Sequence, residues 1–313
     1  MDNVRSEEVK RIFKEAYEAG LEVTDRGKVA NYIPELAKAR KDAFGICMMN
    51  NDGELLRFGD ADTRFTMQSC SKIVNLAVSL KHRGFDETFR HVHMEPTGDA
   101  FNSITKLELS ADIPCNPMIN AGAIQIVSLL ADEFSFDDLL EITRAICMDD
   151  KIELDEAVYR SERDTGDRNR AIAYLLKSKG VLQAEPNKTL DLYFRLCSMS
   201  VSAVSLAGLG LILANNGRNP FNGKQYLEPE YTATIKSLMF TCGLYDGSGE
   251  FGVKVGVPAK SGVGGGMVCA AKGPMGIGLY GPSLDAQGNS VAGMRAMRHL
   301  SGKLHLHAMD YGY

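Results

Sequence analysis

Hydrophobic residues near the N-terminus first follow a helical spacing and then alternate. The charged segment 1–20 places apolar side chains on one stripe, with Gly20 as the expected end of a helix. The residues of that stripe are Val9, Ile12, Phe13 and Ala16. In segment 43–59 hydrophobic residues alternate on both sides of the turn formers Asn51-Asp52-Gly53. The pattern therefore predicts a helix followed by a β-hairpin.

The middle of the chain has the apolar spacing of helices. After residue 67 the spacing becomes helical up to Gly84, whereas residues 85–110 are irregular and rich in turn formers. Almost all of 116–217 is predicted to be helical. The best-delimited helical segments are 118–133, 135–147, 167–179 and 200–214. Ser135 is a start signal for the second of these, and Gly180 is an end signal for the third.

The spacing changes again near Gly252. Strand-like runs are expected at 252–257, 267–271 and 275–280, with a turn at 272–274 and a last helix at 291–300. Strands at both ends and helices between them predict an α+β fold. Its antiparallel sheet of about five strands is flanked by the terminal helices and carries an inserted helical domain. We expect the sheet domain to comprise 1–70 plus 220–313, and the helical insertion 71–219.

Composition narrows the classes of function. The 313 residues carry a net charge of −5 without a basic cluster, which gives no reason to expect nucleic-acid binding. No run reaches the ~18 apolar residues of a membrane span. The N-terminus lacks the apolar core of an export signal, so we expect a cytoplasmic protein with reduced thiols. The seven cysteines contain no Cys-x-x-Cys pair, so neither a zinc ribbon nor a redox pair is expected.

The strongest chemical signal is Ser69-Cys70-Ser71-Lys72, where a strand is expected to give way to a helix. Residues at i and i+3 of a helix share a face, so the Lys72 amine would lie beside the Ser69 hydroxyl as its base. Lysine with its usual pKa of ~10.4 is rarely neutral at pH 7, so burial or a second cation must lower that pKa. Ser-x-x-Lys also arises by chance, and Ser71 is a competing nucleophile that lacks the i+3 lysine.

A second signal, Lys260-Ser261-Gly262, lies far downstream between two strand-like runs. Ser-x-x-Lys followed by Lys-Ser/Thr-Gly is the arrangement of the β-lactamase and penicillin-binding superfamily. Lys260 would supply the second cation, and backbone N–H groups there could complete an oxyanion hole. The alternative is a glycine-rich hairpin with a solvated lysine. The order of the two motifs, with a helical insertion between them, favours catalysis.

Several sequence blocks together resemble the serine-dependent glutaminase family over about residues 20–300. They are 27–34, 68–72, Glu95-Pro96-Thr97-Gly98 with Phe101-Asn102, 116–123, Ser161-Glu162 with 166–169, and 258–263. The block Asn116-Pro117-Met118-Ile119-Asn120-Ala121-Gly122-Ala123 is the most specific. The resemblance implies hydrolysis of L-glutamine to L-glutamate and ammonia without a cofactor. It also implies a homodimer or homotetramer.

The same resemblance implies a role for individual residues. Ser69 would be the nucleophile and Lys72 the general base, with Lys260 supporting them and Tyr245 relaying a proton. The substrate-contacting positions would be Ser69, Asn120, Glu162, Asn169, Tyr193, Tyr245 and the backbone of Val263, with Tyr32 closing the pocket. Glu162 would bind the substrate ammonium, although its charged neighbours also suit an exposed helical acid. Tyr193 could instead be a core aromatic beside Phe194.

Other functions are less well supported. The pairs His91/His93 and His305/His307 have no acidic or cysteine partner at ligand spacing, so no metal site is expected. The glycines of 262–266 match no nucleotide-binding loop. A penicillin-recognising peptidase or β-lactamase would be expected to carry an export signal. A catalytically silent glutamine-binding protein would not need both Ser69 and Lys72.

Overall fold

The computed structural model describes residues 2–97 and 113–310, with side chains from residue 7 onward. Gly98, Phe101 and Asn102, which belong to the blocks that suggest the family, lie outside the described residues. In the described part of the chain, no helix is long and apolar enough to cross a membrane.

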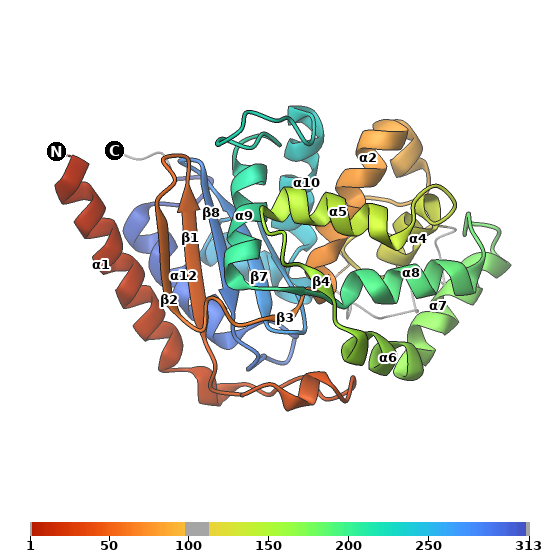
Figure 1. Cartoon of the computed structure of the whole chain (residues 1–313), viewed down its shortest axis with the longest axis horizontal. Helices are drawn as coiled ribbons and strands as arrows, with labels where there is room; N and C mark the ends of the chain where they lie inside the picture. Colours follow the sequence, from red (N-terminus) through yellow and green to blue (C-terminus); the bar gives the residue numbers. More distant parts are fainter. Residues whose placement is uncertain (1, 98–112, 311–313) are drawn as a thin grey trace.

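A five-stranded antiparallel sheet forms the centre of the molecule (Figure 1). Its strands, in spatial order, are β2 (Leu55–Gly59), β1 (Gly45–Asn50), β8 (Met275–Tyr280), β7 (Gly266–Ala271) and β6 (Ala259–Ser261). The N-terminal hairpin joins the C-terminal strands through β1 and β8, with Cys47 opposite Gly278. The predicted sheet, assembled from both ends of the chain, is confirmed.

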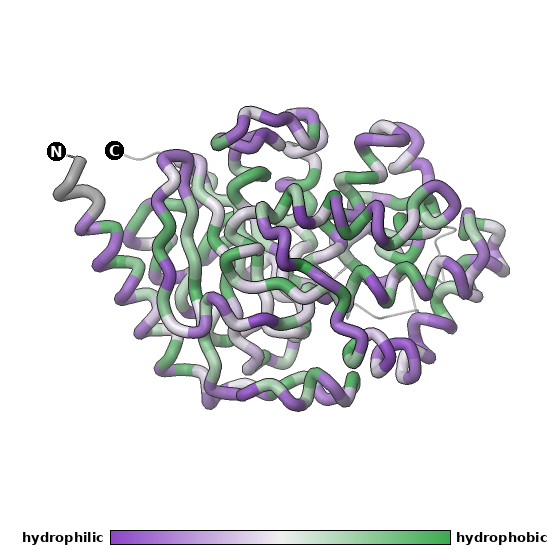
Figure 2. Tube along the Cα trace, in the orientation of Figure 1, coloured by the Kyte–Doolittle hydropathy of each residue, from purple (hydrophilic) through white to green (hydrophobic). Residues whose placement is uncertain are grey.

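Helices cover both faces of this sheet. The terminal helices α1 (Asp2–Leu21) and α12 (Val291–Leu304) contact each other on one face, and α9 (Ala203–Ala214) packs on the other (Figure 1). The stripe predicted for α1 is buried at Ile12, Phe13 and Ala16, and hydrophilic and hydrophobic positions alternate along this helix (Figure 2). A β-carbon at Gly276 would lie 2.0 Å from the Ala207 carbonyl oxygen, so glycine lets α9 approach the strand.

The remaining helices lie mainly beside the sheet. They are α2 (Ser71–Arg90), α4 (Asn120–Leu130), α5 (Phe136–Cys147), α6 (Glu156–Thr165), α7 (Asp167–Ser178), α8 (Pro186–Cys197), α10 (Pro229–Cys242) and α11 (Ser248–Lys254). The short 3-10 helices are η1 (Thr24–Arg26), η2 (Leu36–Lys38), η3 (Gln68–Cys70) and η4 (Tyr245–Gly247). Ser135 caps α5 as its sequence predicts, by accepting a hydrogen bond from the Asp138 N–H.

Some boundaries differ from the sequence-based prediction. The strand expected at 252–257 is wrong, because α11 continues to Lys254 and the strand begins at Ala259. Phe251 and Val255 are buried at helical i, i+4 spacing while Val253 is 80% exposed, which is not a strand pattern. Helix α2 also continues past Gly84 to Arg90, with a kink at Gly84 where φ is +79°.

A three-stranded sheet that the sequence did not reveal joins the helical part to the central sheet. Its order is β3 (Phe65–Thr66), β5 (Met199–Val201) and β4 (Glu153–Leu154). Strands of two or three residues are too short to show an alternating pattern. The division into 1–70 plus 220–313 and 71–219 stays a prediction; α9, from the latter segment, packs on the central sheet.

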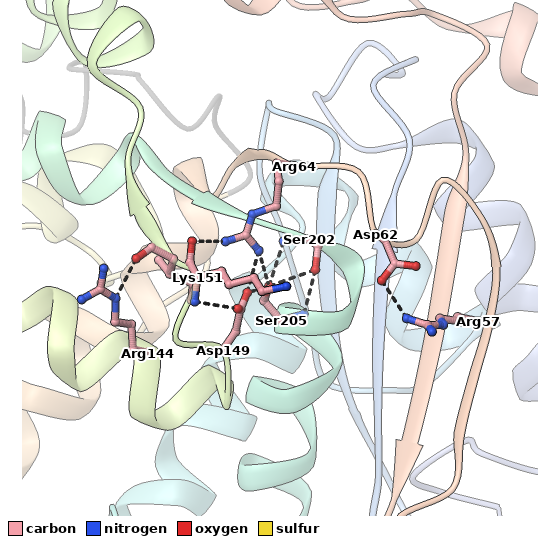
Figure 3. A network of polar contacts seen from close by, with 9 residues as sticks. Arg57, Asp62, Arg64, Arg144, Asp149, Lys151, Ser202 and Ser205 are labelled. Atoms are coloured by element: carbon pink, nitrogen blue, oxygen red, sulfur yellow. Dashed lines mark hydrogen bonds and ion pairs between the residues drawn. The ribbon is translucent and has the colours of Figure 1, made fainter.

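A polar network fixes the start of β3 (Figure 3). The Arg64 guanidinium donates to the Asp149 carboxylate over 2.6 Å and also to the Lys151 carbonyl oxygen. Asp149 accepts a further hydrogen bond of 2.6 Å from Ser205, near the start of α9. Arg64 therefore joins the segment before η3 to the α5–β4 loop and to α9.

Candidate active site

Ser69 lies in η3, the tight turn that links β3 to α2. Gln68, the residue before it, has a left-handed backbone with φ of +47°, which is uncommon for a residue with a side chain. Ser71 is fully buried and donates to the Gln68 carbonyl oxygen over 2.8 Å, so its hydroxyl serves the turn. The regular helix begins at Ser71, slightly later than the sequence suggested, and Lys72 lies in its first turn.

Lys72 is buried among neutral acceptors. Its Nζ donates to the Met118 carbonyl oxygen over 3.1 Å and to Asn120 Oδ1 over 2.8 Å. Burial lowers the pKa of Lys72 to about 8, and the negative charges that Cys197 and Glu162 can carry oppose this shift. Burial is thus the main cause of the lowered pKa that a catalytic base requires.

Lys260 and Tyr245 pack together near Ser69. Lys260 Nζ lies 4.3 Å from the centroid of the Tyr245 ring. Burial, and then the nearby Lys72, lower the pKa of Lys260 to about 7. The Tyr245 hydroxyl is hydrogen-bonded to the Ser69 side chain and donates to the Ser261 carbonyl oxygen over 3.3 Å. Burial raises the pKa of Tyr245 despite these hydrogen bonds, so the phenol keeps its proton.

Glu162 is buried, unlike its neighbours Arg163 and Asp164. This burial rules out its interpretation as an exposed helical acid. Its carboxylate accepts hydrogen bonds from Gln68 Nε2 over 3.3 Å and from Ser198 Oγ over 3.5 Å. Burial raises the pKa of Glu162 to about 8, while these hydrogen bonds and the charge of Lys72 oppose the rise. A carboxylate held by neutral donors is well suited to an incoming cation.

Two amides cross the space between α4 and α7. Asn120 Nδ2 donates to Asn169 Oδ1 over 3.0 Å, while Asn120 Oδ1 accepts from Lys72. Asn120 therefore connects the proposed base to a residue at the start of α7. The two side chains supply polar groups without adding charge.

These residues surround a cavity of about 80 Å³. Its walls include seven of the predicted site residues: Tyr32, Ser69, Asn120, Glu162, Asn169, Tyr193 and Val263. Tyr32 has 52% of its surface exposed and also lines this cavity, where burial and then the nearby Tyr245 and Glu162 raise its pKa. Lys72, Lys260 and Tyr245 lie behind this wall rather than on it.

The loop after β6 lies against η3, the turn that carries Ser69. A β-carbon added to Gly262 would lie 3.3 Å from the backbone nitrogen of Ser69 and 2.9 Å from the Met67 carbonyl oxygen. Cys70 Sγ also donates to the Lys260 carbonyl oxygen over 3.4 Å. The glycine at 262 therefore allows the backbone of Val263 to approach Ser69.

Other residues at the site were not assigned a role by the sequence. Gln68 and Ser198 hydrogen-bond Glu162, and Cys197 lines the cavity. Cys197 lies four residues after Tyr193 on α8, so helical spacing is a signal that could have placed it there. Tyr193 packs edge-on against Phe194 at 6.0 Å and also faces the cavity, so it has both of the environments expected for it.

A larger cavity of about 630 Å³ lies on the other side of Tyr245, beside α10 and α11. Its described walls include Phe240, Val253 and Met309, and they do not include Ser69. The predicted site residues therefore gather mainly at the smaller cavity. Within 2–97 and 113–310, no group of three or more His, Cys, Asp or Glu residues could hold a metal ion.

Comparison with known proteins gives a consistent assignment. The Glutaminase family model matches residues 27–309. Glutaminase 2 of Clostridium perfringens is 46% identical over 302 residues, which cover 95% of this chain and 99% of that protein. A crystal structure of a Bacillus subtilis probable glutaminase has a TM-score of 0.87 at 36% identity and covers 94% of this chain and 96% of that one. A covalent complex of the Bacillus subtilis glutaminase YbgJ has a TM-score of 0.86 at 35% identity, with 95% and 98% covered. Sequence and fold agree over nearly the whole length, and the chain belongs to the glutaminase family.

Proposed function

We propose that this glutaminase hydrolyses L-glutamine to L-glutamate and ammonia by two acyl-transfer steps through Ser69. The observation that carries the proposal is that Ser69 and the buried carboxylate Glu162 line one small cavity. The buried Lys72 lies behind its wall, hydrogen-bonded to Asn120, which also lines the cavity. In the first step, neutral Lys72 takes the Ser69 proton while Ser69 Oγ attacks the side-chain amide carbon of glutamine. The oxyanion is stabilised by the backbone N–H groups of Ser69 and Val263.

The tetrahedral intermediate then loses ammonia. The carbon–nitrogen bond breaks, and the leaving nitrogen takes a proton that Lys72 returns through Tyr245. A γ-glutamyl ester of Ser69 remains. Water attacks this ester by the same route in reverse, giving L-glutamate and free Ser69. Each proton removed by Lys72 is returned within the cycle, so the steps balance without a cofactor.

The opposite end of the cavity recognises the free amino acid. Glu162 pairs with the α-ammonium, and the neutral side chains of Asn120, Asn169 and Tyr193 hold the α-carboxylate. The covalent complex of YbgJ was formed by reaction of that protein with 6-diazo-5-oxo-L-norleucine. That reaction supports a nucleophile at the corresponding cavity of this chain, for which we propose Ser69.

The test compares three substrates. Purified wild-type protein and Ser69→Ala are incubated with glutamine, asparagine and a chromogenic cephalosporin, and ammonia release and ring opening are measured. We expect only glutamine to be turned over efficiently, and kcat of Ser69→Ala to fall by well over a hundredfold with the fold intact. If Ser69→Ala kept more than about a hundredth of the wild-type kcat, covalent catalysis through Ser69 would be wrong.

We further propose a homodimer or homotetramer, because the resemblance to the family implies such an assembly. We also propose a cytoplasmic location, because all seven cysteines are free thiols, as is usual in reducing compartments. Light scattering coupled to size-exclusion chromatography gives the assembly, and cell fractionation gives the location. A monomer at micromolar concentration would contradict the first statement, and a secreted protein would contradict the second.

A further inference from the structure

The structure assigns to Lys260 the role of a positioning residue that holds Tyr245 for proton delivery to the leaving nitrogen. This inference rests on the proposed function, in which Tyr245 carries that proton. The geometry of three segments supports it: the end of α10, the start of η4 and strand β6.

Lys260 is a fully buried lysine that does not form part of the cavity wall. Its Nζ donates to the carbonyl oxygens of Gly243, over 2.9 Å, and Ser261, over 2.6 Å. The face of the Tyr245 ring also lies beside this amine, with its centroid 4.3 Å from Nζ. The printed contacts of Lys260 are therefore with Tyr245 and two carbonyl oxygens rather than with the wall of the cavity.

Tyr245 needs such support because its backbone is strained. Its φ is +57°, in the left-handed region, which costs a residue with a side chain on the order of 1–3 kcal/mol. Ser248 Oγ holds the backbone by donating to the Tyr245 carbonyl oxygen over 2.8 Å. The ring is held separately, by Lys260 across its face and by the hydroxyl's hydrogen bonds to Ser69 and Ser261.

The two carbonyls that accept from Lys260 belong to the segments that determine where the Tyr245 hydroxyl lies. Gly243 is two residues before Tyr245, and a β-carbon there would lie 1.8 Å from the Ala259 carbonyl oxygen, so the turn lies directly on β6. The Ser261 carbonyl oxygen accepts from both Lys260 and the Tyr245 hydroxyl. Lys260 thus fixes the distance between the turn that carries Tyr245 and the strand that orients its hydroxyl.

This role predicts a loss that depends on the leaving group. Ammonia must be protonated as the carbon–nitrogen bond breaks. In the γ-methyl thioester of L-glutamate, the carbon–sulfur bond breaks and the sulfur keeps the electron pair. A thiol is far more acidic than ammonia, with a pKa of about 8.5 for the cysteine side chain, so a thiolate can leave without first taking a proton. A defect in positioning Tyr245 should therefore slow glutamine turnover and largely spare the thioester.

The experiment compares Lys260→Met, Tyr245→Phe and the double variant with both substrates. Lys260→Met should leave both carbonyl oxygens with a hydrogen-bond donor. The Ser261 N–H also donates to the Gly243 carbonyl oxygen, and the Tyr245 hydroxyl donates to the Ser261 carbonyl oxygen. We expect Lys260→Met to lower kcat for glutamine by about a hundredfold or more with KM changed less than about threefold. The kcat/KM for the thioester should fall by less than about tenfold. The double variant should be no slower than Tyr245→Phe alone, because the two residues act as one unit.

Thermal unfolding checks that each variant is folded. Lys260→Gln, a shorter neutral side chain, is the second variant if Lys260→Met does not fold, and the same selective loss is expected. Equal losses for both substrates, multiplying losses in the double variant, or full glutamine activity would overturn the role of Lys260. A failure of the proposed function gives a different result: if Ser69 were not the nucleophile, Ser69→Ala would still cleave the thioester.

Discussion

Gln68 donates a hydrogen bond of 3.3 Å to the buried carboxylate of Glu162, and Gln68 is the residue directly before Ser69. The proposed ammonium-binding group is thus tied through one side chain to η3, the turn that carries Ser69. Gln68 Nε2 also donates to Thr66 Oγ1 over 3.3 Å, so this side chain bridges β3 and Glu162. In the proposed mechanism, a contact made within the free protein therefore couples substrate recognition to the geometry of Ser69.

Glu162→Gln should weaken binding of L-glutamine by about 1.5–3 kcal/mol, the range for a charge-assisted hydrogen bond. The loss should appear mainly in KM if the contact is equally strong in the ground state and the transition state. Steady-state kinetics with glutamine and N-acetylglutamine measures it. The acetylated substrate lacks the ammonium, so it should be poor for the wild type and penalised less by the substitution. If Glu162→Gln weakened the reaction with both substrates by the same factor, an ion pair between Glu162 and the substrate ammonium would be excluded.

Lys72→Arg should be nearly as inactive as Lys72→Ala, even though it keeps the positive charge. Arginine is not deprotonated in proteins and cannot take the Ser69 proton. Single-turnover measurements of ammonia release with both variants test this. Substantial activity in Lys72→Arg would mean that the residue acts as a fixed cation. The base would then be a group other than Lys72.

The pH dependence of kcat/KM should show the ionisation of two groups of the free enzyme, Lys72 and Glu162. Lys72 must lose its proton to act as a base, and Glu162 must lose its proton to pair with the ammonium. Both have pKa values shifted to about 8, Lys72 downward and Glu162 upward. Activity should therefore rise with pH up to about 8 and be lost below it. On a logarithmic plot, the acid limb should approach a slope of two for the wild type.

Glu162→Gln serves as the control for that profile. With one ionisation removed, its acid limb should have a slope of one. The same slope in both proteins would mean that only one of the two groups controls activity in this range. Because the groups interact, the two apparent pKa values belong to the pair rather than to either residue.

The sequence predicted the features that depend on local spacing. The alternation around Ile46 and Met48 predicted the hairpin, and the change to helical spacing after residue 67 predicted the strand-to-helix turn that carries Ser69. The burial of Glu162 could not be read from its charged neighbours, because it depends on how α6 packs near that turn. The contact between Lys260 and Tyr245 is also a tertiary one, since it joins a strand to a turn that precedes it by fifteen residues. The strand predicted at 252–257 was wrong because it counted Val253 as a buried residue, whereas an apolar side chain can also be exposed on a helix.

The last prediction concerns Arg64, which holds the segment leading to Ser69 (Figure 3). Its side chain is 33% exposed, and that of its partner Asp149 is only 17% exposed. Arg64→Met removes the ion pair and the hydrogen bond to the Lys151 carbonyl oxygen, and it leaves a partly buried carboxylate. We expect the free energy of unfolding to fall by about 1.5–3 kcal/mol, measured by urea denaturation.

Arg57→Met is the matched control, because Arg57 and Asp62 form an ion pair whose side chains are 52% and 68% exposed. Exposed pairs contribute about 0–1 kcal/mol, so Arg57→Met should be nearly neutral. Equal losses in the two variants would show that the partial burial of Asp149 adds nothing, and that Arg64 is an ordinary surface charge.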